Sequence, residues 1–218
     1  MKKKWDYFIK NISNKQFLTG IVVFLVGQAI TYYAIKLLIH DPHILDSSID
    51  KHIPFIPEMI IFYSIFYPFV FCTLYYIFIH NKENFRHGII IGTISYLIAD
   101  IIFICFPTIM IRPEISYSKL DWLTGLLIKI TYTGDNPPIN CFPSIHCLFT
   151  FQVIYMTLLL KNSSWKEKTY IIYVGLLIAV STVFVKQHYI YDIIGALGLC
   201  IIMNTLGYIF FNKRVKNS

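Results

Sequence analysis

The sequence predicts an all-α, polytopic membrane protein with six transmembrane helices. Of its 218 residues, 56% are hydrophobic and only 14% are charged, whereas a soluble domain carries roughly 25% charged residues. The apolar residues gather in six stretches of about the 20 residues that a bilayer-spanning helix needs. These stretches are residues 17–39, 59–79, 88–106, 144–160, 169–185 and 188–211. We therefore expect a single membrane domain over residues 1–218.

The first stretch, residues 17–39, is too long for the core of a signal peptide, and no small-residue cleavage site follows it. We interpret it as an uncleaved span. The five cysteines show no CxxC pair and no zinc-like spacing, so they predict neither a disulfide framework nor a structural metal site. The spans follow one another over short connections, except for residues 107–143.

Basic residues predict how the spans are oriented. Thirteen of the 19 Lys and Arg residues lie in the two tails and in loops 80–87 and 161–168, which six spans place on one side. That side carries three acids, and the other side carries six basic residues and nine acids. Because cytoplasmic loops are enriched in Lys and Arg, we expect both termini to be cytoplasmic. The net charge of +7 then reflects topology, and no nucleic-acid partner is expected.

The loop at 107–143 is long for a connector, and long ordered loops are usually functional. Its segment 120–129 is amphipathic and contains a tryptophan, which predicts a helix lying in the membrane interface. The loop ends in a proline-rich run that stops any helix before Ser144. The fourth span therefore begins at Ser144 with unpaired N–H groups and the positive end of its dipole, which favour an anion. His146 lies in the same turn.

A second polar group lies at the start of the sixth span. His188 and Asp192 are four residues apart, so they share one helix face. An aspartate in that position can hold one imidazole N–H and free the other nitrogen, and an ionisable group inside a span is functional by default. The topology places these two residues, His146, Arg112 and Lys186 at the same outer end. Imidazoles, cations and a helix N-terminus at one depth suit a phosphate monoester or diphosphate.

These residues carry a resemblance to a known family. The run from Pro143 to His146 resembles the PSGH motif of the type 2 phosphatidic acid phosphatase family, and the run from Ser181 to Asp192 resembles its third motif, SRxxxxxHxxxD. Arg112 and Pro113 resemble the end of its first motif, KxxxxxxRP. The residues in and around these motifs look closest to those of the inositol-phosphorylceramide-synthase-like branch. The resemblance covers roughly residues 90–205, with the expected catalytic core at about 100–200.

The sequence departs from the family pattern at three positions. Cys105 stands where the first motif has lysine, Thr182 where the third has arginine, and Ile145 where PSGH has glycine. Two of the usual phosphate-holding cations are therefore missing. Lys186 lies one helical turn beyond Thr182 and is our candidate replacement. Further candidates are Lys36, Lys119 and Lys129.

The resemblance implies a catalytic role for His188, His146 and Asp192. His188 would attack phosphorus, Asp192 would orient it, and His146 would protonate the leaving group and then activate water. Substrate would be bound by Arg112, Ser144, Lys186 and the N–H groups around Ile145. The family needs no metal or other cofactor, and no dense cluster of carboxylates, or of His and Cys, is visible in the sequence.

Three functions remain open from the sequence. The first is a cell-membrane phosphatase that hydrolyses a lipid phosphate or diphosphate on the extracytoplasmic side, with membrane lipids as its surroundings. The second is a lipid phosphotransferase that passes the phospho-group to an alcohol. The third is a transporter or scaffold that lost turnover through Cys105 and Thr182. The sequence does not indicate the particular lipid or the oligomeric state.

Overall fold

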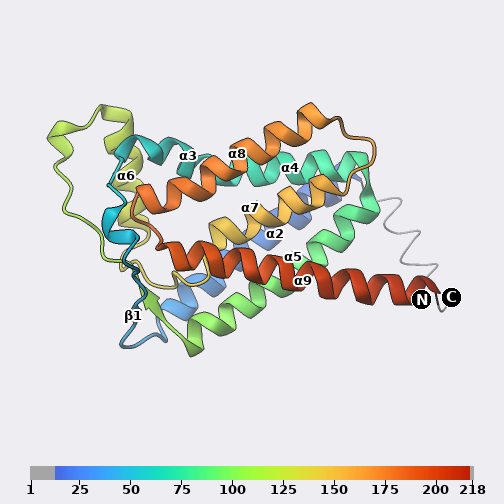
Figure 1. Cartoon of the computed structure of the whole chain (residues 1–218), viewed down its shortest axis with the longest axis horizontal. Coiled ribbons are helices and arrows are strands. Elements are labelled where there is room, and N and C mark those ends of the chain that lie inside the picture. Colours follow the sequence, from blue (N-terminus) through green and yellow to red (C-terminus); the bar gives the residue numbers. More distant parts are fainter. Residues whose placement is uncertain (1–12, 217–218) are drawn as a thin grey trace.

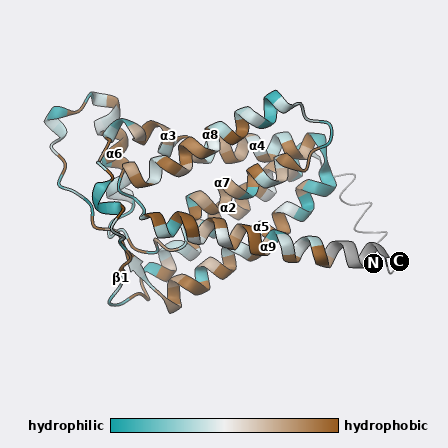
Figure 2. Cartoon of the chain, viewed as in Figure 1, coloured by the Kyte–Doolittle hydropathy of each residue, from teal (hydrophilic) through white to brown (hydrophobic). Residues whose placement is uncertain are grey.

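The computed structural model describes residues 13–216, with side chains as far as residue 210. Its long helices lie side by side along one direction, the shorter α6 crosses one end, and loops gather at the ends (Figure 1). Hydrophobic residues run along the helices, and hydrophilic residues concentrate at the ends (Figure 2). Part of the orientation argument lies outside the described residues, namely Lys2, Lys3, Lys4 and Lys10 and the side chains of Lys213, Arg214 and Lys216.

Within the described residues, five helical segments are long and apolar enough to cross a membrane. They are α2 (Asn14–Lys36), the segment Pro57–His80, α5 (Lys82–Cys105), α8 (Trp165–Phe184) and α9 (Ile190–Lys216), the last counted as far as Phe210. This fits the predicted multi-pass membrane protein. The side of the membrane on which each loop lies stays a prediction.

The sixth predicted span is shorter than expected. α7 (Ile145–Leu158) has 14 residues, which is about 21 Å of helix against a hydrocarbon core of roughly 30 Å. It packs against α5, α8, α9 and the second half of the Pro57–His80 segment, and nine of its side chains are buried. Because protein surrounds α7, irregular backbone can follow it at membrane depth without facing lipid. The count of six spans therefore stays a prediction.

The second predicted span is broken near its middle. It comprises a 3-10 turn, η2 (Pro57–Met59), followed by α3 (Ile60–Ser64) and α4 (Phe66–His80). Pro68 has no backbone N–H for the carbonyl of Ser64 four residues earlier, which explains a break at this point. The break leaves two buried aromatic side chains, Tyr63 and Phe66, side by side near the start of α7.

One end of the bundle is built from three loops joined by hydrogen bonds. β1 (His43–Ile44) pairs in parallel with β2 (Thr108–Ile109), and Ile109 also bridges to Ile139. The Thr108 hydroxyl accepts the Phe142 N–H at 2.9 Å. Short 3-10 turns lie in the same loops, η1 (Asp50–His52) and η3 (Tyr117–Lys119). These contacts hold both ends of the long loop beside the start of α7.

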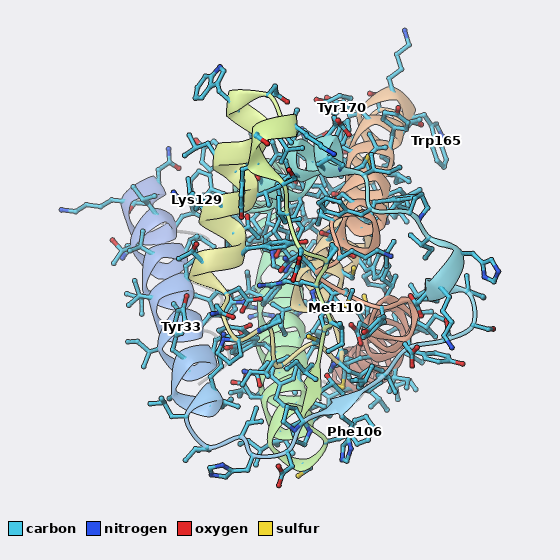
Figure 3. The ribbon with its side chains drawn as sticks, turned by 90° about the vertical axis from the view of Figure 1, so that its left-hand side faces the viewer. Tyr33, Phe106, Met110, Lys129, Trp165 and Tyr170 are labelled. Atoms are coloured by element: carbon cyan, nitrogen blue, oxygen red, sulfur yellow. The ribbon has the colours of Figure 1, made fainter. Side chains whose placement is uncertain are left out.

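The helix predicted in the long loop is present as α6 (Trp122–Gly134). Asp121 caps it by accepting the N–H groups of Leu123 and Thr124, each at 3.0 Å. Ile128 is fully buried, whereas Trp122 is 77% exposed. In Figure 3, α2 and α6 lie on one side of this end of the bundle and α8 and α9 on the other, with Met110 between them. The placement of α6 in a membrane interface stays a prediction.

Candidate active site

The end of α8 turns the chain toward the site. Gln187 N–H donates to Thr182 O at 2.9 Å and Lys186 N–H donates to Val183 O at 3.3 Å, which is the Schellman pattern of helix termination. That pattern needs a left-handed residue, and Lys186 takes this role with φ 50°. The His188 N–H also donates to Thr182 O, at 3.2 Å. The sharp turn therefore delivers Gln187 and His188 to the start of α9.

The candidate nucleophile, His188, lies two residues before α9 begins, so the prediction that it shares a helix face with Asp192 is wrong; the turn before the helix brings the two side chains together. Asp192 is fully buried, and its Oδ2 lies 3.2 Å from His188 Nδ1. The same oxygen accepts the Tyr189 N–H at 2.9 Å. Oδ2 is thus an acceptor of two donors, so the proton of the imidazole belongs on Nδ1 and the lone pair on Nε2. This is the orientation that a nucleophilic imidazole requires.

A contact between two helix starts brings the second histidine into the site. Ser144 N–H donates to Asp192 O at 3.1 Å, so the beginning of α7 is tied to the beginning of α9. Gly195 of α9 faces the Phe142 ring so closely that a Cβ there would overlap it. As a result, the imidazoles of His146 and His188 lie with their ring centroids 6.0 Å apart.

Aromatic rings hold His146 in place. Its imidazole stacks on Tyr63 with a centroid distance of 4.5 Å and packs against Phe66 at 4.4 Å. Both rings flank the break between α3 and α4, so that break shapes the pocket of the candidate acid.

A buried ion-pair group lies beside the histidines. Arg112 donates to Asp135 Oδ2 at 2.7 Å and to Gln187 Oε1 at 2.7 Å. Lys36 Nζ, at the end of α2, pairs with the other carboxylate oxygen of Asp135 at 3.1 Å. The Tyr32 hydroxyl donates to that oxygen as well, at 2.6 Å. Two cations thus share one carboxylate, and the group keeps a net positive charge that favours an anionic ligand.

The candidate substrate-binding residues fall in different places. Ser144 is fully buried, is the N-cap of α7 and accepts the Cys147 N–H at 3.3 Å; Ile145 begins the helix. Lys186 Nζ instead donates to Ile53 O at 2.6 Å. Burial lowers the pKa of Lys186, and Asp50 partly offsets this.

Of the positions that depart from the family, Thr182 is buried and its hydroxyl donates to Ala179 O at 2.7 Å, while Cys105 is exposed at the end of α5. Lys119 and Lys129 are both exposed. Of the candidate replacement cations, Lys36 is therefore the one that the structure pairs through Asp135 with Arg112.

One group of side chains could hold a metal. Cys141, His188 and Asp192 each offer a ligand atom within 4.8 Å of the others, a group that the sequence does not reveal because Cys141 comes from a separate segment. Burial raises the pKa of the Cys141 thiol, the carboxylates of Asp192 and Asp135 raise it further, and Arg112 lowers it. A thiol that stays protonated is a poor ligand at neutral pH.

Several residues of the site have no local signal in the sequence. Asp135 and Gln187 contact Arg112 across 23 and 75 residues. Asp50 accepts the Ile190 N–H at 3.0 Å, across 140 residues, and so caps α9.

Neighbouring imidazoles, a carboxylate bonded to one of them and partly buried cations lie at one end of an apolar helical bundle, an arrangement that suits a phosphate group. The sequence model of the PAP2 superfamily matches residues 28–206, and the chain belongs to this superfamily. No curated protein and no solved structure matches it. Membership supports phosphatase or phosphotransferase activity on lipid phosphates in general. The inositol-phosphorylceramide-synthase-like branch stays a prediction.

Proposed function

We propose that the protein is a metal-independent phosphatase that hydrolyses a lipid phosphate or diphosphate at the outer membrane face through a phosphohistidine on His188. The observation that carries this proposal is the 3.2 Å hydrogen bond between His188 Nδ1 and Asp192 Oδ2. It frees Nε2 for attack, and a second imidazole, His146, lies beside it. Family membership supports the class of reaction.

The reaction proceeds in two steps. In the first, the lone pair of His188 Nε2 attacks phosphorus, the bond to the lipid oxygen breaks, and His146 gives that oxygen a proton. In the second, His146 takes a proton from water as the water oxygen attacks phosphorus. The phosphorus–nitrogen bond then breaks, and phosphate leaves. Asp192 stabilises the imidazolium that forms when His188 is phosphorylated.

The phosphoryl oxygens are held by fixed donors, because the transition state spreads charge over them. Arg112, the Ser144 hydroxyl and the N–H of Ile145 are the proposed partners. Lys36 supplies a second buried cation through the shared carboxylate of Asp135. Lys186 can take part only if its ammonium leaves the carbonyl of Ile53.

A lipid phosphotransferase of the predicted branch is the second candidate. His188 is only 8% exposed, and the aromatic rings of Tyr63 and Phe66 enclose its neighbour His146. Such a sheltered site restricts water and favours a lipid alcohol as acceptor. The two candidates share the first step and differ only in the acceptor of the second.

The decisive experiment is turnover of a panel of lipid phosphates and diphosphates by the purified protein, with phosphate release and transfer to alcohols both measured. His188→Ala should abolish turnover and also the acid-labile, base-stable phosphoenzyme. His146→Ala should lose most activity on lipid alkoxide leaving groups and recover part of it on nitrophenyl phosphate, whose leaving group needs no proton.

Asp192→Asn provides the matched variant, because it keeps the shape of the side chain. Loss of an orienting aspartate costs about 10⁴ in a serine protease triad, and we expect a large loss here by analogy. Turnover by His188→Ala near the wild-type rate would overturn the mechanism. If the wild type turns over none of the substrates with any acceptor, the transporter or scaffold function is favoured instead.

A further inference from the structure

The residue that precedes the candidate nucleophile in the chain is Gln187, a position that the third motif leaves unspecified. It is 3% exposed. Its Oε1 accepts a hydrogen bond from Arg112 at 2.7 Å. A guanidinium has only donors, so the carboxamide atom that faces it must be the oxygen. Arg112 thus fixes the orientation of the carboxamide and leaves the Nε2 hydrogens to point elsewhere.

Arg112 and Gln187 each have one hydrogen-bond donor without an acceptor. Gln187 Nε2 and Arg112 Nε are both buried without a hydrogen-bond partner. A buried donor left unsatisfied costs roughly 1–3 kcal/mol, and native structures contain few of them. Two on side chains that contact each other, one of them on the residue that precedes His188, indicate a site that is completed by an anion with several oxygens.

Neither the residue at the position of the missing arginine nor the first candidate to replace it is free for this role. The Thr182 hydroxyl donates to Ala179 O at 2.7 Å inside the core, and the Lys186 ammonium donates to Ile53 O at 2.6 Å. The Schellman turn that occupies these residues is what carries Gln187 past them to the side of Arg112. Gln187 therefore lies five residues beyond Thr182 in the chain.

We propose that Gln187 is a substrate-binding residue whose Nε2 donates to the phosphoryl group, together with Arg112 Nε, in the place of the missing third-motif arginine. This inference rests on the proposed function. A neutral amide holds a phosphoryl oxygen without adding charge. Lys36 and Arg112 then supply the charge, and Asp135 sets their positions.

The test is the inhibition constant of orthovanadate and the KM for a lipid phosphate, measured on the full-length protein in detergent. Gln187→Leu should raise both by about tenfold or more, the size expected for a lost hydrogen bond to a charged group. Gln187→Glu should raise them further, because a carboxylate can still accept from Arg112 but repels the phosphoryl oxygens. Retention of the Arg112 contact also favours folding of this second variant.

Gln152→Leu is the matched control. Gln152 is equally buried, at 3%, but its amide contacts Gly88 and Asn204 in the bundle. This variant should lose thermal stability and keep the wild-type vanadate constant. The inference is overturned if Gln187→Leu and Gln187→Glu both keep the wild-type vanadate constant and KM while the wild type is active. A wild type that neither turns over lipid phosphates nor binds vanadate would overturn the proposed function and this inference together.

Discussion

Lys186 shows how one residue can serve the backbone rather than the chemistry. Its φ of 50° is a conformation that costs an L-residue about 1–2 kcal/mol and costs glycine almost nothing. Lys186→Gly therefore removes the ammonium without straining the turn. Relief of the backbone strain is offset by loss of the hydrogen bond to Ile53 O, so we expect stability within about 1 kcal/mol of the wild type and a change in kcat/KM of less than about threefold, roughly 0.6 kcal/mol.

Thermal denaturation and steady-state kinetics of Lys186→Gly check both expectations. A fall in kcat/KM of about tenfold, or 1.4 kcal/mol, would instead assign the ammonium to the phosphoryl group, as the sequence suggests. Lys119→Ala, at an exposed position, is the control and should have no effect.

Because Cys141, His188 and Asp192 could together hold a metal ion, the metal independence of the activity needs a direct test. We expect activity to survive excess EDTA, because His188 Nδ1 is committed to Asp192 and the Cys141 thiol stays protonated. Cys141→Ser removes the thiol ligand, and the activity of this variant should likewise be unchanged by EDTA. Complete loss on chelation, restored by a divalent ion, would contradict the proposed mechanism.

At the scale of elements, packing of α9 against the loop before α7 sets the distance between the histidines. Gly195→Ala would push Phe142 or α9 aside. We expect it to lower stability by about 1–3 kcal/mol, as overpacking does, and to reduce kcat more strongly than KM. Thermal denaturation and kinetics measure the two effects.

Gly198 provides the control within the same helix, since a Cβ there has no neighbour within 4 Å. Gly198→Ala should keep full activity. Equal behaviour of the two variants would show that the approach of α9 to Phe142 does not position the site.

The hydropathy pattern predicted where the helices are, but not all their ends. α5 and α8 begin earlier than the predicted spans because polar first turns are capped by Asn81 and Ser164. The short length of α7 could not be predicted, since its burial depends on neighbours that hydropathy does not describe. Motif spacing predicted the residues that pair locally, such as His188 with Asp192. Gln187 was missed because its partner, Arg112, lies 75 residues away in the chain.

At the scale of the whole molecule, the orientation in the membrane is the main open prediction. The positive-inside rule places residues 40–58 and 107–143 outside and the loops at 80–87 and 161–168 inside. An impermeant thiol reagent applied to intact cells should label Asp46→Cys and Ser118→Cys but not Asn162→Cys, all at exposed positions. The native cysteines are first replaced. The reverse pattern would move the active site to the cytoplasm.

The carboxylate shared by Lys36 and Arg112 also constrains how the sequence can drift. Removing Asp135 alone would leave Lys36 and Arg112 without their shared counter-charge, and removing one cation would leave the carboxylate with a single ionic partner. The Asp135 side chain is 28% exposed, so each loss costs less than the about 3–5 kcal/mol of a fully buried pair. We therefore expect Lys36, Arg112 and Asp135, on three separate segments, to vary together in evolution. Among descendants of this gene, substitutions at 36, 112 and 135 should appear jointly, and a neutral residue at 135 should accompany loss of the lysine at 36.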